Sequence, residues 1–270
     1  MARRIDRFFS DEYIEEELQT TRLRFIPRVE WSRGGEAEFR VPFKFKLVLP
    51  GVKRKWKLFV GNMVDPDNDL NPNITDTRVN ELDGSQEADT SSFLGIERDV
   101  FTKIRQSLKL RSGIKVRFRE VNPFAWVRYR YTAFFSVWTL RVTEKVYWFG
   151  DTGFGERTTL EWDRPLLDQA MQLRLTTTGT WAETSAGLEL VQSLEIRRLI
   201  REGMAISLSY QVAAHFRPTK EVDSHTIGVG WRQRFLRDWM FLDIQPQVRY
   251  LETEDYRPSA VLFASVEIIF

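Results

Sequence analysis

The sequence contains no cysteine and only two histidines, His215 and His225, among 270 residues. The absence of cysteine excludes disulfide bonds, thiolate metal sites and cysteine nucleophiles, and it suits passage through an oxidising compartment without cross-links. No stretch approaches the roughly 18 consecutive apolar residues of a membrane-spanning helix. A helical membrane protein is therefore excluded, and two histidines leave little material for acid–base catalysis.

An excess of charge of one sign is also lacking, because 40 Lys and Arg face 38 Asp and Glu, for a net charge of +2. We therefore expect no nucleic-acid partner, and nothing in the sequence indicates a cofactor. Residues 1–20 have no continuous apolar core and no small-residue cleavage site, so they do not read as a signal peptide, although a processed chain would look the same. Aromatic residues make up 13% of the chain, which excludes disorder.

Two-residue alternation, by contrast, is abundant after residue 20. In 37–49 the odd positions are apolar and most even positions are charged, and 107–119 repeats the pattern. The last segment, 259–270, alternates in the same way and ends on Phe270. Side chains of a β-strand point alternately to two faces, so the sequence predicts an all-β chain of amphipathic strands.

Turn signals such as Pro50-Gly51, Asn122-Pro123, Gly150-Asp151, Arg164-Pro165 and Arg217-Pro218 separate about fourteen such strands, most of roughly 9 to 13 residues. A tilted strand needs about this length to cross a bilayer. The strand near 93–101 is the weakest, since its alternation breaks at Glu97-Arg98-Asp99, and twelve strands are the alternative. We expect residues 1–20 to form a short amphipathic segment and 21–270 a single β domain.

Alternation also fits a soluble sandwich or a small soluble barrel. A closed up-and-down meander of a dozen or more strands, however, is too wide for side chains to fill, so its apolar face must point outward to lipid. The tryptophans support an apolar face that points to lipid. Most of them fall on the apolar side of their strands and near the strand ends, which lie at the membrane interface that such rings prefer. Trp126 and Trp239 do not fit, which implies either a shifted strand or rings that point inward. The conforming residues are Trp31, Trp56, Trp138, Trp148, Trp162, Trp181 and Trp231.

Connection lengths predict the orientation of the barrel. The even-numbered connections are short, whereas the odd-numbered connection at 64–90 is long and carries eight acidic residues. This asymmetry is typical of bacterial outer-membrane barrels with an even strand number. We therefore expect an outer-membrane location, both termini in the periplasm, and contact with the bilayer and lipopolysaccharide.

The chain resembles bacterial outer-membrane β-barrels over its length after residue 20. Its end is similar to their C-terminal insertion signal, with Phe270 as the final aromatic and Val266 and Ile268 on the same face; this implies recognition by the barrel-assembly machinery. Segments 141–166, 237–250 and 256–270 resemble an uncharacterised family of proteobacterial outer-membrane proteins. That family carries no assigned activity, so the resemblance implies location and fold only.

With the apolar face outward, the charged residues that alternate with it line the lumen, and most of them are basic. The preferred hypothesis is a passive channel whose cationic wall favours small anionic solutes. Alternatively, Arg and Glu from opposite walls could pair and close the lumen, or the barrel could be a structural unit that binds lipid phosphates or, through residues 1–20, a periplasmic partner. The predicted selectivity residues are Arg24, Arg28, Arg40, Lys44, Lys46, Lys109, Arg111, Lys115, Arg117, Arg128, Arg130 and Arg141.

Two further features indicate little chemistry. Asp65, Asp67 and Asp69 alternate like the first ligands of a calcium loop, but Leu70 replaces the expected glycine, so they predict a weak cation site at most. His225 follows Asp223 and Ser224, yet adjacent strand residues point apart, and we place His215 at the membrane interface. We expect no enzyme, with lipid modification as the least favoured function.

Overall fold

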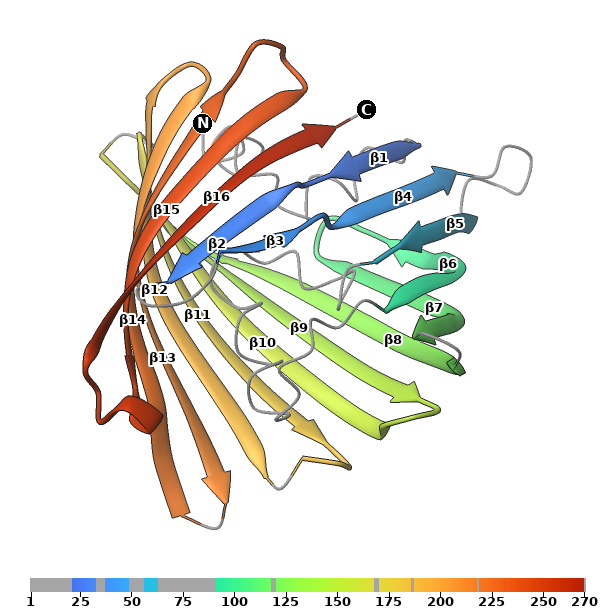
Figure 1. Ribbon diagram of the computed structural model, residues 1–270. Helices are drawn as coiled ribbons and strands as arrows, with labels where there is room; N and C mark the ends of the chain where they lie inside the picture. The colour runs from blue at the N-terminus through green and yellow to red at the C-terminus, as the bar shows by residue number, and fades with distance from the viewer. Residues whose placement is uncertain are drawn as a thin grey trace.

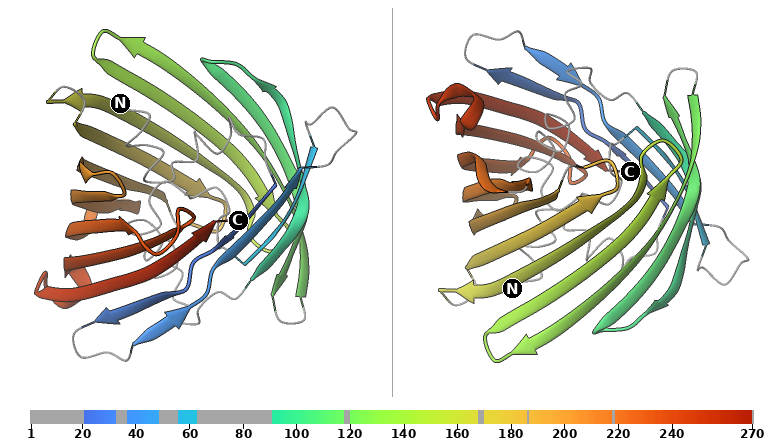
Figure 2. Two further views of the ribbon diagram at one scale, coloured as in Figure 1. Left: turned by 90° about the horizontal axis from the view of Figure 1, so that it is seen from above. Right: turned by 90° about the horizontal axis from the view of Figure 1, so that it is seen from below.

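The computed structural model describes residues 21–32, 37–48, 56–62, 91–117, 120–167, 170–185, 187–217 and 219–269. It is a closed antiparallel β-barrel (Figure 1), and the described residues contain no α-helix. The strands surround a single axis when they are viewed from either end (Figure 2). The predicted all-β, up-and-down barrel is therefore confirmed.

Sixteen strand segments make up fourteen strands, because β1 with β2 and β3 with β4 each form one interrupted strand. Each strand pairs with its chain neighbours, and β16 pairs back onto β1 and β2 to close the barrel. The segments are β1 Arg22–Phe25, β2 Arg28–Ser32, β3 Glu38–Arg40, β4 Phe43–Val48, β5 Trp56–Gly61, β6 Ser92–Thr102, β7 Gln106–Arg117, β8 Glu120–Phe135, β9 Trp138–Phe149, β10 Gly153–Leu166, β11 Met171–Ala182, β12 Leu188–Arg201, β13 Met204–Arg217, β14 Thr219–Arg234, β15 Met240–Leu251 and β16 Pro258–Ile269, with a short 3-10 turn at Glu252–Glu254.

The first two strands are interrupted where the sequence places a proline. Residues 37–49 were expected to form one continuous strand, and this prediction was wrong: β3 ends before Val41-Pro42 and β4 begins after it. Pro27 separates β1 from β2 in the same way. Proline has no N–H for the ladder, and the two breaks lie side by side, since the Ile26 amide donates to the Pro42 carbonyl at 2.8 Å.

The doubtful fourth strand exists as β6, which gives fourteen strands rather than twelve. Glu97 and Asp99 do not interrupt it; both side chains are buried inside the barrel, while Leu94 and Ile96 point outward. A register irregularity follows between Asp99 and Phe101. The alternation looked broken in the sequence because charged residues occupy the inward-facing positions of β6 just before the register irregularity.

Strand boundaries differ from the expected turns at several places. Asn122-Pro123 and Arg164-Pro165 were predicted as turns but lie inside β8 and β10, near the ends of those strands where a missing N–H is tolerated. The connections from β6 to β7, β8 to β9, β10 to β11, β12 to β13 and β14 to β15 have five residues or fewer. The short connections predicted at this end of the barrel are confirmed for the described residues, but the connections at the opposite end from β7 onward also have six residues or fewer.

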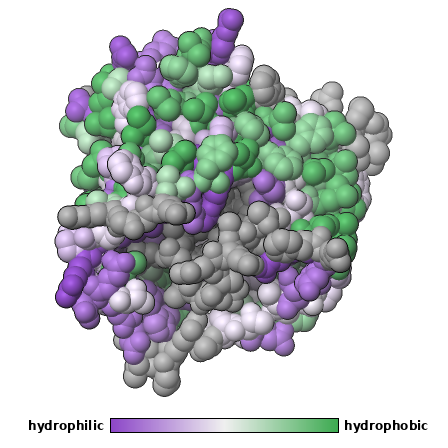
Figure 3. Space-filling model, in the orientation of Figure 1, coloured by the Kyte–Doolittle hydropathy of each residue, from purple (hydrophilic) through white to green (hydrophobic). Residues whose placement is uncertain are grey.

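The two faces of the wall differ in chemistry. Apolar side chains cover much of the outside, and hydrophilic ones gather towards the upper and lower rims of the view (Figure 3). Outward tryptophans near the strand ends, such as Trp31 at 60% exposure, agree with the predicted interface positions. Trp126 is 3% exposed and lies inside, whereas Trp239 is exposed in the turn before β15. The predicted assignment of alternate residues to the outer and inner faces is thus correct, and the Trp126 ring points inward.

Candidate functional site: the charged inner wall

The inner face of the sheet carries the predicted basic residues. Arg28, Arg40, Lys46, Lys115 and Arg117 are partly buried; Arg40 donates to Glu38 at 2.6 Å, and Lys115 pairs with Asp151 at 3.0 Å. The fully buried ones are Arg24, Lys44, Lys109, Arg111, Arg128, Arg130 and Arg141. The structure therefore places all twelve residues away from the apolar outer face, but it joins many of them to acids.

The Glu97 cluster is the densest group of charges and spans β4 to β7. Arg111 donates to Glu97, with Nε at 3.1 Å from Oε2, and Lys46 Nζ lies 2.9 Å from Oε1. Lys57 Nζ is 2.6 Å from Asp99 Oδ2, and Lys109 Nζ lies between both acids at 4.0 and 3.9 Å. Both carboxylates are buried, so two negative charges sit among four positive ones from three other strands.

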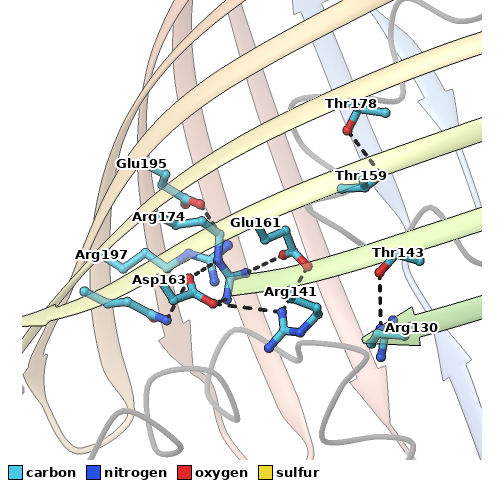
Figure 4. A network of polar contacts seen from close by, with 11 residues as sticks. Arg130, Arg141, Thr143, Thr159, Glu161, Asp163, Arg174, Thr178, Glu195 and Arg197 are labelled. Carbon is cyan, nitrogen blue, oxygen red and sulfur yellow. Dashed lines mark hydrogen bonds and ion pairs between the residues drawn. The ribbon is translucent and has the colours of Figure 1, made fainter. Parts of the chain in front are cut away.

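A second cluster, the Glu161–Asp163 cluster, occupies β9 to β11 (Figure 4). Arg174 donates two hydrogen bonds to Asp163, from Nε to Oδ1 at 2.7 Å and from Nη2 to Oδ2 at 3.2 Å. Arg141 donates to Glu161 at 3.0 Å, and Gln172 donates to Asp163 at 3.3 Å. Cross-strand pairing sets this arrangement, because Asp163 faces Arg174 and Glu161 faces Arg141 directly in the register.

The third group, the seam cluster, lies where the barrel closes. Glu267 on β16 pairs with Arg24 on β1 and with Arg232 on β14. Arg232 also donates to Asp243 at 2.8 Å. Towards the other end of the same seam, Arg249 of β15 donates to Glu30 of β2 at 3.3 Å. Ion pairs therefore cross the closing strand pair, in which only two β1 residues have register partners on β16.

Basic residues outnumber acidic ones among the buried side chains of the described residues, by thirteen to six. The six acids lie on β6, β10, β12 and β16, and each has a basic partner within 4.0 Å. On β7, β8 and β9, as far as these strands are described, the buried charged residues are all basic: Lys109, Arg111, Arg128, Arg130, Arg141 and Lys145.

Aromatic rings interrupt the charged wall on β5 to β9. Phe124 packs edge-on against Phe93 at 5.6 Å and against Phe59 at 6.1 Å, and stacks on Phe149 at 5.6 Å. Trp126, two residues further along the strand, belongs to the same buried cluster. The Arg111 guanidinium lies over both Phe59 and Trp126, at 4.3 and 4.6 Å from the ring centroids. Rings and cations are therefore in direct contact.

Several members of these clusters were not predicted. Glu97 and Asp99 were treated as a break in a strand, and the cations of the second half of the chain were not assigned to the wall. Their position in the two-residue alternation was the signal that could have identified them, since on each strand they alternate with outward apolar residues. The missed residues include Glu97, Asp99, Asp163, Arg174, Arg197, Arg232 and Arg249.

The histidines lie on opposite faces of the wall. His215 was expected at the interface but shares the inner parity of β13, where its Nδ1 contacts Asp223 across a register irregularity. His225 points outward, stacks on Tyr210 and lies 2.9 Å from its hydroxyl through Nδ1. The described residues contain no group of three potential metal ligands. Within the same residues, no helix has the length and hydropathy needed to span a membrane.

Some predictions lie outside the described residues: the segment 1–20, the acidic connection with Asp65, Asp67 and Asp69, and Phe270. Of the predicted insertion signal, Val266 and Ile268 are described. Both lie on the outer parity of β16, and Ile268 pairs with Phe25 of β1 and with Met240 of β15. The closing position of the last strand is therefore confirmed up to Ile269.

Comparison with solved structures places the fold among outer-membrane barrels. A bacterial polysaccharide outer-membrane secretin matches with a TM-score of 0.52 and 10% identity over 93% of this chain and 98% of its own. OccK2 (OpdF) of Pseudomonas aeruginosa matches with a TM-score of 0.50 and 7% identity over 93% of this chain and 97% of its own. CdiB of Acinetobacter baumannii gives 0.57 and 9% identity, covering 94% of this chain and 60% of its own.

These similarities establish a transmembrane β-barrel fold and nothing about substrate, because the identities are far below those that accompany shared function. No family model and no curated protein matches the sequence. The resemblance to a specific uncharacterised family therefore remains a prediction, whereas the likeness to outer-membrane barrels rests on the whole described wall.

Proposed function

We propose that the protein is a bacterial outer-membrane barrel with both termini in the periplasm, in contact with lipopolysaccharide and inserted by the barrel-assembly machinery. The outward apolar wall supports the membrane location, since such a surface is unfavourable in water. The orientation is proposed from the sequence, in which the long connection at 64–90 joins β5 to β6 at the end opposite to the one at which β16 finishes. A periplasmic partner for residues 1–20 belongs to the same proposal.

Within that membrane, the function supported best is passive diffusion of small anionic solutes along a cationic wall, with no catalytic step. The observation that carries this proposal is the excess of buried basic over acidic residues, and above all that the buried charged residues of β7 to β9, as far as these strands are described, are all basic. Rings of like charge set the selectivity of wide pores. The basic residues nearest the middle of these strands, Arg128 and Arg130, would carry the selectivity.

A second candidate, a non-conducting structural barrel, is favoured by the three ion-pair clusters. Each buried acid holds basic side chains in place against the wall, and paired side chains of this length can fill a small barrel. The two candidates make opposite predictions in one experiment.

That experiment is single-channel conductance of the purified full chain in a planar bilayer under a salt gradient. We expect discrete conductance with a reversal potential that indicates anion preference. The double variant Arg128→Gln/Arg130→Gln should lower the anion-to-cation permeability ratio about two- to fivefold, since it removes two inner charges of the wall. Arg198→Gln is the matched control, because Arg198 is exposed on the outer face of β12.

The outcomes separate the candidates. No conductance from correctly folded protein would exclude the channel and leave the structural barrel. A cation-selective reversal potential would exclude the cationic-wall proposal even if the pore conducts.

A further inference from the structure

Two arginines on the outer face of the wall each lie over a tryptophan ring. Arg98 of β6 and Arg164 of β10 are exposed and occupy outward positions of their strands. The Arg164 guanidinium lies 5.3 Å from the ring centroid of Trp138, and the Arg98 guanidinium lies 5.1 Å from the ring centroid of Trp56. A guanidinium on the lipid-facing side of a barrel is unfavourable except near the membrane surface, so the depth of these two residues matters.

Both arginines lie near the end of the barrel at which β16 finishes, the β16 end. β6 ends at Thr102 and β10 ends at Leu166, so Arg98 and Arg164 lie four and two residues from that end. With about 3.3 Å per residue and a strand tilt of about 40°, four residues correspond to roughly 10 Å along the barrel axis. This is the depth of lipid headgroups and of the adjoining part of the acyl chains, not of the bilayer centre.

The surroundings of Arg164 are aromatic and apolar. Trp138 packs edge-on against Trp162, and Trp162 stacks on Phe135, with 6.4 Å between the ring centroids in each pair. On the other side of Arg164, its register partner on β11 is Leu173. The guanidinium therefore lies between an indole and a leucine, beside rings that come from β8, β9 and β10.

Arg98 repeats this arrangement on another part of the wall. In the register it lies between Trp56 of β5 and Leu110 of β7. Arg198 of β12 is also exposed at an outward position, three residues from the β16 end, but its register partners on β11 and β13 are not aromatic. Arg198 therefore has the depth and exposure of the other two arginines without the indole.

Neither Arg98 nor Arg164 is held by an acid. Among the described residues, neither forms an ion pair with an Asp or a Glu, whereas the inner residues Arg111 and Arg174 are joined to buried carboxylates. A guanidinium that stacks on an indole still presents its N–H groups at the edge of its plane, in a fork that matches the oxygens of a phosphate. Both outward arginines therefore have donors available for an anion.

The connections at the two ends of the barrel differ in charge. As far as they are described, the connections at the β16 end hold three basic and two acidic residues, and those at the opposite end hold one basic and five acidic residues. The basic residues at the β16 end are Lys103, Arg105 and Arg237, and the acids at the opposite end are Asp151, Glu183, Glu252, Glu254 and Asp255. An anionic lipid is therefore favoured at the β16 end and disfavoured at the other.

We propose that the two Arg–Trp sites, Arg98 with Trp56 and Arg164 with Trp138, bind the phosphate of an anionic glycerophospholipid. The phosphate accepts hydrogen bonds from the guanidinium, and the acyl chains lie on the indole and the neighbouring leucine. A lipid with a net negative charge fits better than a zwitterionic one, because neither arginine has an acid beside it, among the described residues, to pair with a headgroup ammonium.

The inference rests on the membrane location proposed above and does not depend on conduction. In the proposed orientation the β16 end faces the periplasm, so the bound lipid belongs to the inner leaflet, whereas lipopolysaccharide belongs to the outer one. Recovery of the protein without detergent would refute the membrane location itself, whereas the outcomes below concern the Arg–Trp sites alone.

The test measures lipid binding to the purified full chain in detergent by native mass spectrometry, with phosphatidylglycerol and phosphatidylcholine of equal acyl chains as probes. We expect phosphatidylglycerol to bind about five- to tenfold more tightly. The double variant Arg98→Gln/Arg164→Gln should reduce this preference to less than twofold and leave ion selectivity in bilayers unchanged, since both residues lie outside the lumen. Arg164→Lys keeps the charge and loses the planar fork, so the preference should still fall about twofold.

Arg198→Gln is the matched control, because Arg198 is an outward arginine near the same end without an indole. It should change the preference less than twofold. Equal binding of the two lipids, an unchanged preference in the double variant, or an equal loss in Arg198→Gln would overturn the Arg–Trp sites. Displacement of phosphatidylglycerol by the same concentration of sodium phosphate would also overturn them, because the acyl chains would then contribute nothing.

Discussion

At the residue scale, the inner wall depends on which side chains face each other across neighbouring strands. Glu97 is buried among Lys46, Lys57, Lys109 and Arg111, which come from strands on both sides of it. Gly155 occupies an inner position opposite Tyr147, where any larger residue would meet the ring. In the sequence, Glu97 looks like a break in the alternation and Gly155 looks like an ordinary glycine, because the role of each depends on a partner on another strand.

Gly155→Ala should destabilise the barrel by about 1–3 kcal/mol, since the new methyl group overlaps the Tyr147 ring and must displace it. Gly179→Ala is the control, because a Cβ there meets only Leu188 Cδ1 at 3.8 Å. Urea unfolding in lipid vesicles, followed by tryptophan fluorescence, would measure both. Equal stability of the two variants would mean that the Tyr147 ring does not need the bare backbone.

At the element scale, alternation predicted the strands but not their interruptions. The period of two identifies each strand and its outer face from local sequence alone, as in 107–119. The breaks at Pro27 and Pro42 were missed because proline is tolerated at strand ends, as Pro165 shows in β10. The pairing of Arg24 with Glu267 could not be predicted, since it joins the two ends of the chain and depends on how the barrel closes.

Glu267→Gln should loosen the closing seam. The carboxylate pairs with Arg24 and Arg232, and its loss removes the charge that joins β1 to β14 across β16, where β1 has only two residues in register with β16 and β2 has five. Amide hydrogen exchange in β1 and β16 should rise about tenfold or more, while β12 and β13 stay protected.

The control for the seam is Glu195→Gln, which removes a buried carboxylate that pairs with Arg197 on its own strand. Faster exchange at β1 and β16 in this variant as well would indicate general destabilisation. Unchanged exchange in Glu267→Gln would show that backbone pairing alone holds the barrel shut.

At the scale of the whole molecule, the sequence contained the fold class, the strand number and the orientation of the two faces. The fold class and the orientation of the faces follow from the two-residue alternation and from the width of a many-stranded barrel, and the strand number follows from the turn signals between the alternating segments, so none of the three needs knowledge of register. The ion-pair clusters on the inner wall depend on the strand register, which for example places Asp163 opposite Arg174. The sequence therefore predicted basic residues on the inner face but not the acids with which they pair.

The intact protein should be recovered from cells with the membranes, withstand alkaline carbonate extraction and require detergent for solubilisation. The physical reason is the outward apolar surface, which includes Val127, Leu194, Leu208 and Val229 at 42–52% exposure. Centrifugal fractionation followed by immunoblotting measures this. Quantitative recovery in the soluble fraction would contradict the assignment of the outer face to lipid.

The uneven distribution of charge around the wall has one more consequence. Buried charges on β7 to β9 are basic, while the buried acids of the described chain lie on β6, β10, β12 and β16. A solute close to β7, β8 or β9 therefore meets buried positive charge on those strands, with the nearest buried acids on the flanking strands β6 and β10. A molecule with its own dipole would be turned by this charge as it passes, with its negative end towards the β7 to β9 side.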